Sequence, residues 1–260
     1  MSDLSEVPLS GGNTTSGIVR IGDTVRRPSR PQSPAMAALL THLETKGFTA
    51  APRYLDQDDQ GRDILSYLDG DVGLPPNAFE HDSALIAAAK LLRAFHDATV
   101  GLIAKPNLPW AEPPSEAPEV ICHSDFAPYN MVFRDGLPVG IFDFDLASPG
   151  PRLRDIAYLA YWMVPLGFAA KDLAHEANCD LAAGSPRLRA FATAYGYPAD
   201  AALLDAVDHA LGRMADKPRC AAVLGTAVAN TLERTGQFAH WAAERHAFSQ
   251  ARDALGKNLD

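Results

Sequence analysis

The chain has 260 residues, of which 47% are hydrophobic and 21% charged, an ordinary composition for a soluble globular protein of one large or two small domains. Its net charge of -9 argues against nucleic acid as a partner, because phosphate backbones require a basic surface. No apolar run is long enough to span a membrane, and no secretion signal begins the sequence, so we expect a cytoplasmic protein without a membrane partner. Three cysteines without CxxC spacing predict reduced thiols.

The first part of the chain has the pattern of a small sheet with one helix. β-Branched residues on both sides of a Gly-Asp pair predict a hairpin over residues 17–28. Apolar residues at helical spacing predict a helix over residues 35–46. A second hairpin is expected around residues 58–61, and it ends in a strand over residues 64–68.

Helical patterns dominate the rest of the chain. Apolar residues recur at helical spacing over the ranges 83–96, 153–164, 186–195, 199–215 and 221 to about 254. Residues 104–118 hold five prolines and predict a loop. Residues 120–145 are the one β-like segment, with two short apolar runs around the turn at residues 134–138. The order therefore predicts an α+β fold in which one hairpin is carried by the helical part.

Polar residues of a particular kind flank this hairpin. Asp125 and Asn130 lie just before its first strand, and Asp143 follows its second strand. Phosphoryl transfer requires metal ions across the phosphates and a carboxylate that orients the attacking hydroxyl. Because the hairpin folds the chain back, an amide oxygen and a carboxylate can converge on one Mg²⁺, which prefers hard oxygen ligands.

The order and spacing of these residues match a known pattern. His123-Ser-Asp125, Asn130 and Asp143-Phe-Asp145 follow one another as in the protein-kinase catalytic loop and its metal-binding aspartate. The segment most closely resembles the aminoglycoside phosphotransferase (APH) family of phosphotransferase enzymes, in the protein-kinase-like superfamily. That family carries a His-Gly-Asp-x-x-x-x-Asn loop and then an Ile-Asp-Trp-Glu-like segment. The resemblance covers residues 9 to about 165.

The resemblance implies a bilobal protein-kinase-like fold of the α+β class. A small β-rich N-terminal lobe over residues 1–68 would bind the nucleotide, and a larger helical C-terminal lobe over residues 69–260 would carry the catalytic loop and the substrate site. The implied activity is Mg²⁺-dependent transfer of the γ-phosphoryl group of ATP or GTP to a hydroxyl of a small molecule. The acceptor would be an aminoglycoside-like antibiotic, an amino alcohol or a sugar, and an acidic cleft would favour a cationic one.

The resemblance also implies roles for the residues around the hairpin. Asp125 would accept or orient the proton of the acceptor hydroxyl, and His123 would brace the catalytic loop. Asn130 and Asp143 would bind Mg²⁺. Asp145 would assist the metal or brace Arg152 or Arg154. For Asp155, which begins a predicted helix, we favour an N-cap or helix-dipole role, and His96 is interpreted as a core histidine.

Nucleotide contacts are implied in the first lobe. The backbone of Ser66 and Leu68 would bond the adenine edge, as a hinge between the lobes. A loop over residues 9–16 would cover the phosphates, because its glycines let backbone N–H groups approach closely. The residues of that loop expected at the phosphates are Gly11, Gly12 and Asn13.

The basic residue of this lobe departs from the family pattern. Arg26 falls where the family has a nucleotide-binding lysine, and Met36 falls near the helix glutamate that would pair with it. A register slip of one residue would turn Arg27 inward instead, because neighbouring strand residues face opposite sides. Glu44 is the remaining acidic candidate on the same predicted helix.

Two other classes of function remain open on the sequence alone. One is a catalytically weak, kinase-like module that binds a nucleotide or another ligand, and whose nucleotide binding is weakened by the changes at Arg26 and Met36. The other is a structural or interaction protein, which would leave the Asp and Asn pattern without a purpose. Turnover separates the first alternative from an enzyme, and nucleotide binding separates the second.

Overall fold

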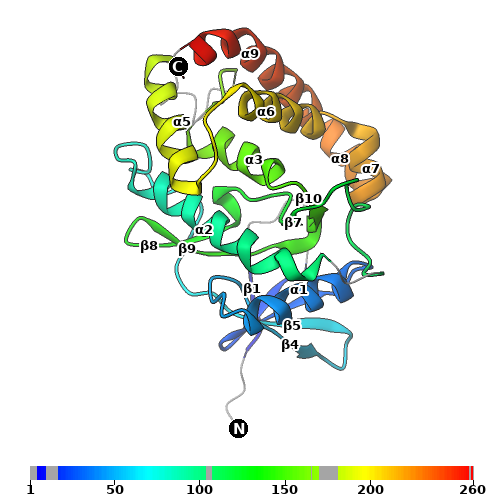
Figure 1. The fold of residues 1–260 in the computed structure, drawn as a ribbon. Helices are drawn as coiled ribbons and strands as arrows, with labels where there is room; N and C mark the ends of the chain where they lie inside the picture. Colours follow the sequence, from blue (N-terminus) through cyan, green and yellow to red (C-terminus); the bar gives the residue numbers. More distant parts are fainter. Residues whose placement is uncertain are drawn as a thin grey trace.

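The computed structural model describes residues 5–9, 17–103, 107–164, 166–169, 181–257 and 259, without the side chains of 181–185 and 257. It has a sheet-rich N-terminal part and a helical C-terminal part, which confirms the predicted α+β class. Figure 1 shows the two parts at opposite ends of the molecule, with α2 (Ser83–Thr99) crossing between them. The cysteines Cys122 and Cys220 are buried free thiols, and Cys179 lies outside the described residues.

The N-terminal part is built on one antiparallel sheet. Its strands lie in the order β1-β2-β3-β5-β4. Both predicted hairpins are confirmed, and the short first strand was not predicted because two residues carry no pattern. The strands are β1 (Val7–Pro8), β2 (Val19–Ile21), β3 (Thr24–Pro28), β4 (Tyr54–Gln57) and β5 (Arg62–Ser66).

Helix α1 (Ser33–Thr45) lies between β3 and β4 in the chain and packs against the C-terminal part. Proline in its first turn is preorganised for a helix, since the missing N–H would have no partner there. One face of α1 is buried, and it includes Met36, Leu39 and Leu43. The helix contacts both α2 and the short turn η3 (Phe144–Leu146). Helix α1 therefore reaches the segment that carries Asp145.

Two further small sheets lie in the C-terminal part. The predicted hairpin is confirmed as β8 (Met131–Arg134) and β9 (Leu137–Ile141), and β6 (Asp71–Val72) adds to its edge. A second pair joins β7 (Val120–Cys122) to β10 (Ser148–Gly150). Two single turns complete this region, η1 (Val100–Leu102) and η2 (Pro128–Asn130).

Helices account for most of the remaining chain. The single long helix predicted from residue 221 is wrong, because the chain turns at Gly225 (φ 92°) and Gly236 (φ 80°), a conformation that glycine adopts without strain. No helix in the described ranges is long and apolar enough to cross a membrane. The helices are α3 (Leu153–Met163), α5 (Leu181–Tyr195), α6 (Ala201–Met214), α7 (Lys217–Leu224), α8 (Thr226–Arg234) and α9 (Gln237–Lys257).

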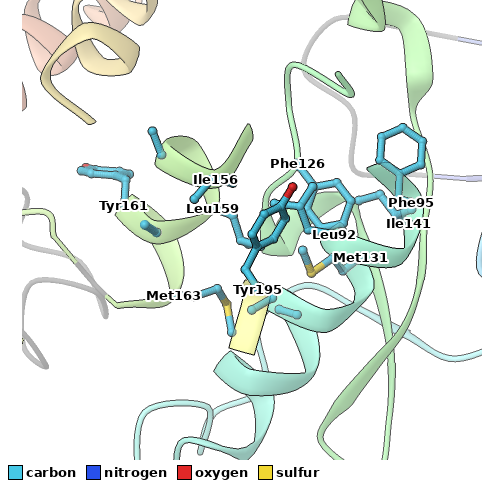
Figure 2. Packing of buried hydrophobic residues seen from close by; sticks show 14 of the residues in the cluster. Leu92, Phe95, Phe126, Met131, Ile141, Ile156, Leu159, Tyr161, Met163 and Tyr195 are labelled. Carbon is cyan, nitrogen blue, oxygen red and sulfur yellow. The ribbon is translucent and has the colours of Figure 1, made fainter. Parts of the chain in front are cut away.

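The hydrophobic core surrounds α2, which packs against β7, β9, α3 and α5. Figure 2 shows Phe95 and Leu92 of α2 beside Phe126 and Met131 from the segment around the hairpin. Full burial of a side chain of this size contributes about 1.5–3 kcal/mol to folding. The candidate catalytic loop is thus fixed to the core through Phe126, whose ring centroid lies 6.1 Å from that of Phe95.

Candidate active site

Asp125 and Asn130 lie next to each other at the start of the β8–β9 hairpin. The Asn130 Nδ2 donates to the Asp125 backbone oxygen (3.0 Å) and to its Oδ2 (2.9 Å). The Tyr129 hydroxyl donates to Asp125 Oδ1, so both carboxylate oxygens accept a hydrogen bond. Burial raises the pKa of Asp125 above its ordinary value, against the opposing effects of the Tyr129 bond and the His123 charge.

Asp143 follows the other strand of the hairpin. The Phe142 N–H donates to the Asn130 carbonyl (3.0 Å), which ties the residue before Asp143 to the loop of Asp125. Asp143 has a left-handed backbone (φ 66°, ψ 64°), and its side chain is 38% exposed. Burial, followed by the neighbouring charge of Asp145, raises its pKa.

The side chains of Asn130 and Asp143 have the chemistry of Mg²⁺ ligands. Because Asn130 uses its Nδ2 toward Asp125, its amide oxygen remains available to a cation, as does the partly exposed Asp143 carboxylate. An amide oxygen and a carboxylate are hard ligands, and Mg²⁺ takes its other ligands from water and phosphates. No group of three or more His, Cys, Asp or Glu side chains in the described part of the chain forms a metal site, so an all-protein cage is not seen there.

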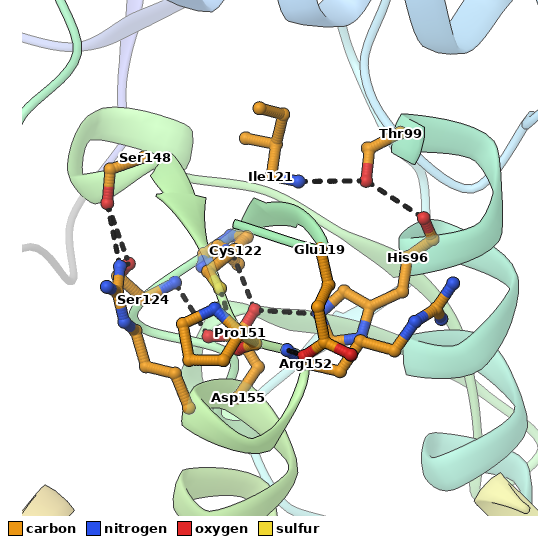
Figure 3. Close-up of polar contacts among 12 residues, drawn as sticks. His96, Thr99, Glu119, Ile121, Cys122, Ser124, Ser148, Pro151, Arg152 and Asp155 are labelled. Atoms are coloured by element: carbon orange, nitrogen blue, oxygen red, sulfur yellow. Dashed lines mark hydrogen bonds and ion pairs between the residues drawn. The ribbon is translucent and has the colours of Figure 1, made fainter. Parts of the chain in front are cut away.

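A buried carboxylate braces the loop from behind. Asp155, in the first turn of α3, accepts from the backbone N–H of His123 (2.6 Å) and of Ser124 (2.9 Å). Figure 3 shows Asp155 beside Ser124 and His96. Its third partner is His96 Nε2 (3.1 Å), whose Nδ1 lies 2.7 Å from the Tyr195 hydroxyl. His96 is thus a fully buried histidine with a partner on each ring nitrogen.

The pKa of Asp155 reflects these bonds. Burial is the strongest influence and alone would raise it, but the hydrogen bond and charge of His96, with the bond from His123, lower the pKa overall. The sequence predicted Asp155 at the start of a helix, but its contact with the backbone of His123 and Ser124 was not predicted. Ser124 has a left-handed backbone (φ 65°), where the resembled family has glycine, so the bond from its N–H stabilises a conformation that disfavours serine.

His123 lies in the core and does not reach a reacting position. Its side chain is fully buried, and its Nε2 lies 3.0 Å from the carbonyl oxygen of Phe142. The ring centroid is 4.7 Å from that of Phe144, between the two candidate metal-binding segments. This placement agrees with a brace that joins the two sides of the hairpin.

The structure resolves which arginine of β3 faces inward, and the predicted position of Arg26 is corrected. Arg26 bonds Thr24 (2.6 Å) and lies 3.8 Å from Asp58, away from Asp143. Arg27 is 5% exposed, and its guanidinium contacts Asp145 at 2.5 Å. The alternation of faces along β3 could have predicted this, because Val25 packs on the core and Arg27, two residues later, lies on the same face.

Asp145 has neither of the arginine partners expected from the sequence. Its carboxylate accepts from Arg27 Nη2 and lies 3.4 Å from Arg30 Nε. Arg152 instead pairs with Asp97, and Arg154 donates to Ser148.

The other predicted nucleotide contacts are only partly described. Gly11, Gly12 and Asn13 lie outside the described residues. The Ser66 N–H donates to the Arg53 carbonyl (2.9 Å) within the sheet, so this donor already has a partner. Ser66 and Leu68 line a cavity of about 350 Å³ together with α1 residues, and the lining does not include Asp125, Asn130 or Asp143.

An aromatic cluster that sequence reasoning did not find lies beside Asp125. The Tyr129 and Tyr158 hydroxyls are 2.8 Å apart, and the Trp162 ring meets Tyr129 edge-on at 5.4 Å. Burial raises the pKa of both tyrosines, and the neighbouring Asp125 carboxylate raises it further. Tyr129 is 40% exposed as a whole, while its hydroxyl bonds Asp125 and Tyr158. Tyr158 and Trp162 share one face of α3 at i,i+4 spacing, the one signal for this cluster in the sequence.

Comparisons with known proteins agree with the predicted resemblance. Residues 103–223 match the family described as "Phosphotransferase enzyme family" (APH), a range that includes the loop of Asp125 and the segment of Asp143. A "Trifolitoxin immunity protein" from Rhizobium leguminosarum bv. trifolii is 35% identical over 150 residues. That match spans 55% of this chain and 56% of the relative, so about half of each protein is compared.

Solved structures share the fold along nearly the whole chain. A Plasmodium vivax ethanolamine kinase has a TM-score of 0.67 at 12% identity and covers 95% of this chain and 83% of its own. The gentamicin complex of APH(2")-IIa has a TM-score of 0.60 at 16% identity, and the match covers 93% of this chain and 91% of that structure's chain. A choline/ethanolamine kinase family protein from Mesorhizobium loti scores 0.55 at 18% identity, covering 98% and 94%. The predicted kinase-like fold is therefore confirmed, and the match of residues 103–223 to the phosphotransferase family agrees with the predicted resemblance.

Proposed function

From the family match over residues 103–223 and the kinase-like fold, we propose that the protein is a small-molecule phosphotransferase. It moves the γ-phosphoryl group of ATP or GTP to a hydroxyl of its acceptor. The observation that carries this proposal is the hydrogen-bonded placement of Asp125, Asn130 and the segment of Asp143 at one end of a single hairpin. Phosphoryl transfer depends mainly on positioning and charge stabilisation, and these groups supply both.

Each residue has a definite task in this reaction. Asp125 orients the acceptor hydroxyl and takes its proton, and the Tyr129 hydroxyl on Oδ1 marks where an acceptor hydroxyl would bond. The Asn130 amide oxygen and the Asp143 carboxylate would hold Mg²⁺. When bound, Mg²⁺ supplies positive charge that offsets the charge of the phosphates. His123 and Asp155 keep the loop in place from behind.

The aromatic cluster of Tyr129, Tyr158 and Trp162 indicates which kinds of acceptor could bind beside Asp125. The exposed ring of Tyr129 offers a face next to Asp125, and aromatic faces bind the apolar side of sugar rings or alkylammonium groups. We therefore place aminoglycoside-like antibiotics, amino alcohols and sugars first among the acceptors. The name of the 35% identical relative describes immunity to trifolitoxin, which favours an antibiotic or toxin as one arm of the screen.

The second candidate is a nucleotide-binding module with weak turnover. Met36 favours it, because α1 offers a thioether where a carboxylate would be expected to pair with the phosphate-binding residue. Measured turnover separates the two candidates, since both bind nucleotide.

The first experiment is calorimetry of ATP and GTP with and without Mg²⁺. We expect Mg²⁺-dependent binding of at least one nucleotide, weakened about tenfold or more by Asp143→Asn because a charged ligand is lost. Asp135→Asn is the matched control, since Asp135 is exposed in the turn of the same hairpin. An acceptor screen follows, in which Asp125→Asn should abolish turnover. If a folded wild-type protein binds neither nucleotide, the proposal is wrong.

A further inference from the structure

Three arginines of the C-terminal part converge on one carboxylate, that of Glu112. Its Oε2 lies 2.6 Å from Arg213 Nη2 and 4.0 Å from Arg154 Nη1, and its Oε1 lies 2.6 Å from Arg219 Nε. The arginines belong to α3, the last turn of α6 and α7, and Glu112 belongs to the loop before β7. We call Arg154, Arg213 and Arg219 the arginine cluster. In a chain of net charge -9, this cluster sets three cations against one anion.

The arginine cluster is crowded and largely enclosed. The exposed fractions of its side chains are between 15% and 23%, and that of Glu112 is 12%. In the part of the chain that the structure describes, Glu112 is the carboxylate with which all three arginines pair. Burial lowers the pKa of Arg219, and the charge of Arg213 lowers it further, as expected for like charges held together. The cluster would therefore attract a further anion.

One carboxylate does not satisfy the donors of this cluster. Arg219 Nε is buried and, although it lies close to Glu112, makes no hydrogen bond to a described residue. Arg154 Nη1 donates to Ser148 Oγ (2.9 Å) and reaches Ser124 Oγ (3.4 Å). These two hydroxyls lie 3.5 Å apart (Figure 3). Because each guanidinium presents a planar fork that matches carboxylate and phosphate oxygens, the two oxygens of Glu112 leave donors for another oxyanion.

The arginine cluster lies next to the candidate catalytic loop. Ser124, which Arg154 reaches, immediately precedes Asp125. Tyr158 follows Arg154 by four residues on the same face of α3, about 6 Å further along the helix axis. The Tyr158 hydroxyl bonds that of Tyr129, which donates to Asp125. A molecule whose hydroxyl lies at Asp125 therefore has the cluster within reach of its neighbouring groups.

The loop that carries Glu112 is attached to β10 independently of this side chain. The Ala111 N–H donates to the Ala147 carbonyl (3.4 Å), and the Ser115 N–H donates to the Pro149 carbonyl (3.4 Å). The Glu112 side chain can therefore leave the arginines while the backbone of its loop stays in place. For the same reason we expect Glu112→Gln to fold.

We propose that the arginine cluster is an anion-binding subsite for the acceptor, which takes a carboxylate or phosphate group that the acceptor carries beside its reacting hydroxyl. Glu112 is the internal carboxylate that stands in for this group, and the acceptor displaces it. The inference rests on the proposed phosphotransferase function. It narrows the acceptors to antibiotics, amino alcohols or sugars that also carry an anionic group.

Calorimetry with inorganic phosphate tests the subsite without a nucleotide. Glu112→Gln removes the internal anion, so it should bind phosphate about tenfold more tightly than wild type. Adding Arg219→Met to this variant should remove at least that gain. Glu233→Gln is the matched control, because Glu233 pairs with Lys217 at the exposed surface, and its affinity should stay within about twofold of wild type.

The phosphate titration has clear contrary outcomes. If Glu112→Gln binds phosphate no more tightly than wild type, the arginines and Glu112 form a structural ion-pair network only, and the inference is overturned. If the gain survives Arg219→Met, phosphate binds elsewhere in the molecule and the inference is also overturned. Circular dichroism confirms the folded state of each variant, and a gain in affinity cannot come from misfolding.

Acceptor kinetics then distinguish a carboxylate from a phosphate. Hydroxy acids and sugar phosphates are compared with uncharged sugars and simple amino alcohols, with Mg²⁺ and nucleotide present. Arg213→Met should raise KM about tenfold or more for the preferred anionic class and change kcat little, since it removes binding and not chemistry. Arg245→Met makes the same change of charge at a pair with Asp208 (2.8 Å) and should change KM less than about twofold.

The kinetic outcomes separate this inference from the proposed function. If only uncharged or cationic acceptors are phosphorylated, the inference is overturned and the proposed function stands. If phosphate binds as expected but no acceptor of any class is phosphorylated, the proposed function and the acceptor role of the subsite fail, whereas the anion site itself stands.

Discussion

Removing the Asp155 carboxylate should destabilise the protein more than removing any surface aspartate. Asp155 is fully buried and accepts three hydrogen bonds, two from backbone N–H groups and one from His96. Asp155→Ala leaves those donors without partners, each at a cost of about 1–3 kcal/mol. Loss of one member of such a buried charged group costs about 3–5 kcal/mol, and this is the expected decrease in the free energy of unfolding. Asp155→Asn retains one acceptor oxygen and should cost about 1–3 kcal/mol.

Urea unfolding followed by circular dichroism at pH 7 measures both losses. Asp200→Ala provides the control, because Asp200 caps α6 through a single bond to the Leu203 N–H and should cost about 1 kcal/mol. A decrease in the free energy of unfolding below about 1 kcal/mol for Asp155→Ala would refute the reasoning, since three unpaired buried donors should together destabilise the protein by more than that.

The pH dependence gives the same prediction a second test. Because the folded pKa of Asp155 lies below its ordinary value of 3.8, its ionised form is favoured by folding. The resulting stability is fully present above the unfolded pKa and is lost as pH falls through the folded pKa. The stability difference between wild type and Asp155→Asn should therefore stay constant from neutral pH to about pH 5 and shrink below about pH 4.

Three further substitutions test the fold by thermal or urea unfolding. Gly70→Ala should cost about 2–4 kcal/mol, because a Cβ would lie 2.6 Å from the Phe133 oxygen at φ 140°, and a loss below about 1 kcal/mol would contradict this contact. Gly225→Ala, at φ 92° with nothing within 4 Å, should cost only about 1 kcal/mol, so equal losses at the two glycines would show that the contact at Gly70 does not matter. Phe95→Ala should cost about 3–5 kcal/mol because it empties the centre of the core, and a loss near that of Gly225→Ala would mean that neighbouring side chains refill the space.

Local patterns were enough to predict the elements that carry the candidate site. The hairpin between Asn130 and Asp143 follows from two apolar runs around a turn, and helix α2 follows from apolar residues at helical spacing. The convergence of Asp125 with Asn130 was predictable for the same reason, because both lie in one short loop before a strand.

Features set by distant contacts could not be predicted in the same way. Asp155 meets the loop of His123 only because α3 packs behind it, and Asp145 meets Arg27 across the junction of sheet and helices. The inward position of Arg27 depended on a strand register that one residue reverses. The helix ends at Gly225 and Gly236 could not be predicted, because a glycine within a helical pattern can either continue the helix or end it.

The ion pair between Arg27 and Asp145 joins residues 118 positions apart in the sequence, whereas Asn130 and Asp143 belong to one hairpin. Contacts between sequence neighbours close quickly, and distant contacts form later because a long loop must first be ordered. Synthesis proceeds from the N-terminus, so the sheet that carries Arg27 emerges well before its acidic partner. The acidic half of the site should therefore gain amide protection early in refolding, and the complete site should appear only later, when the N-terminal sheet docks onto the hairpin that has already formed.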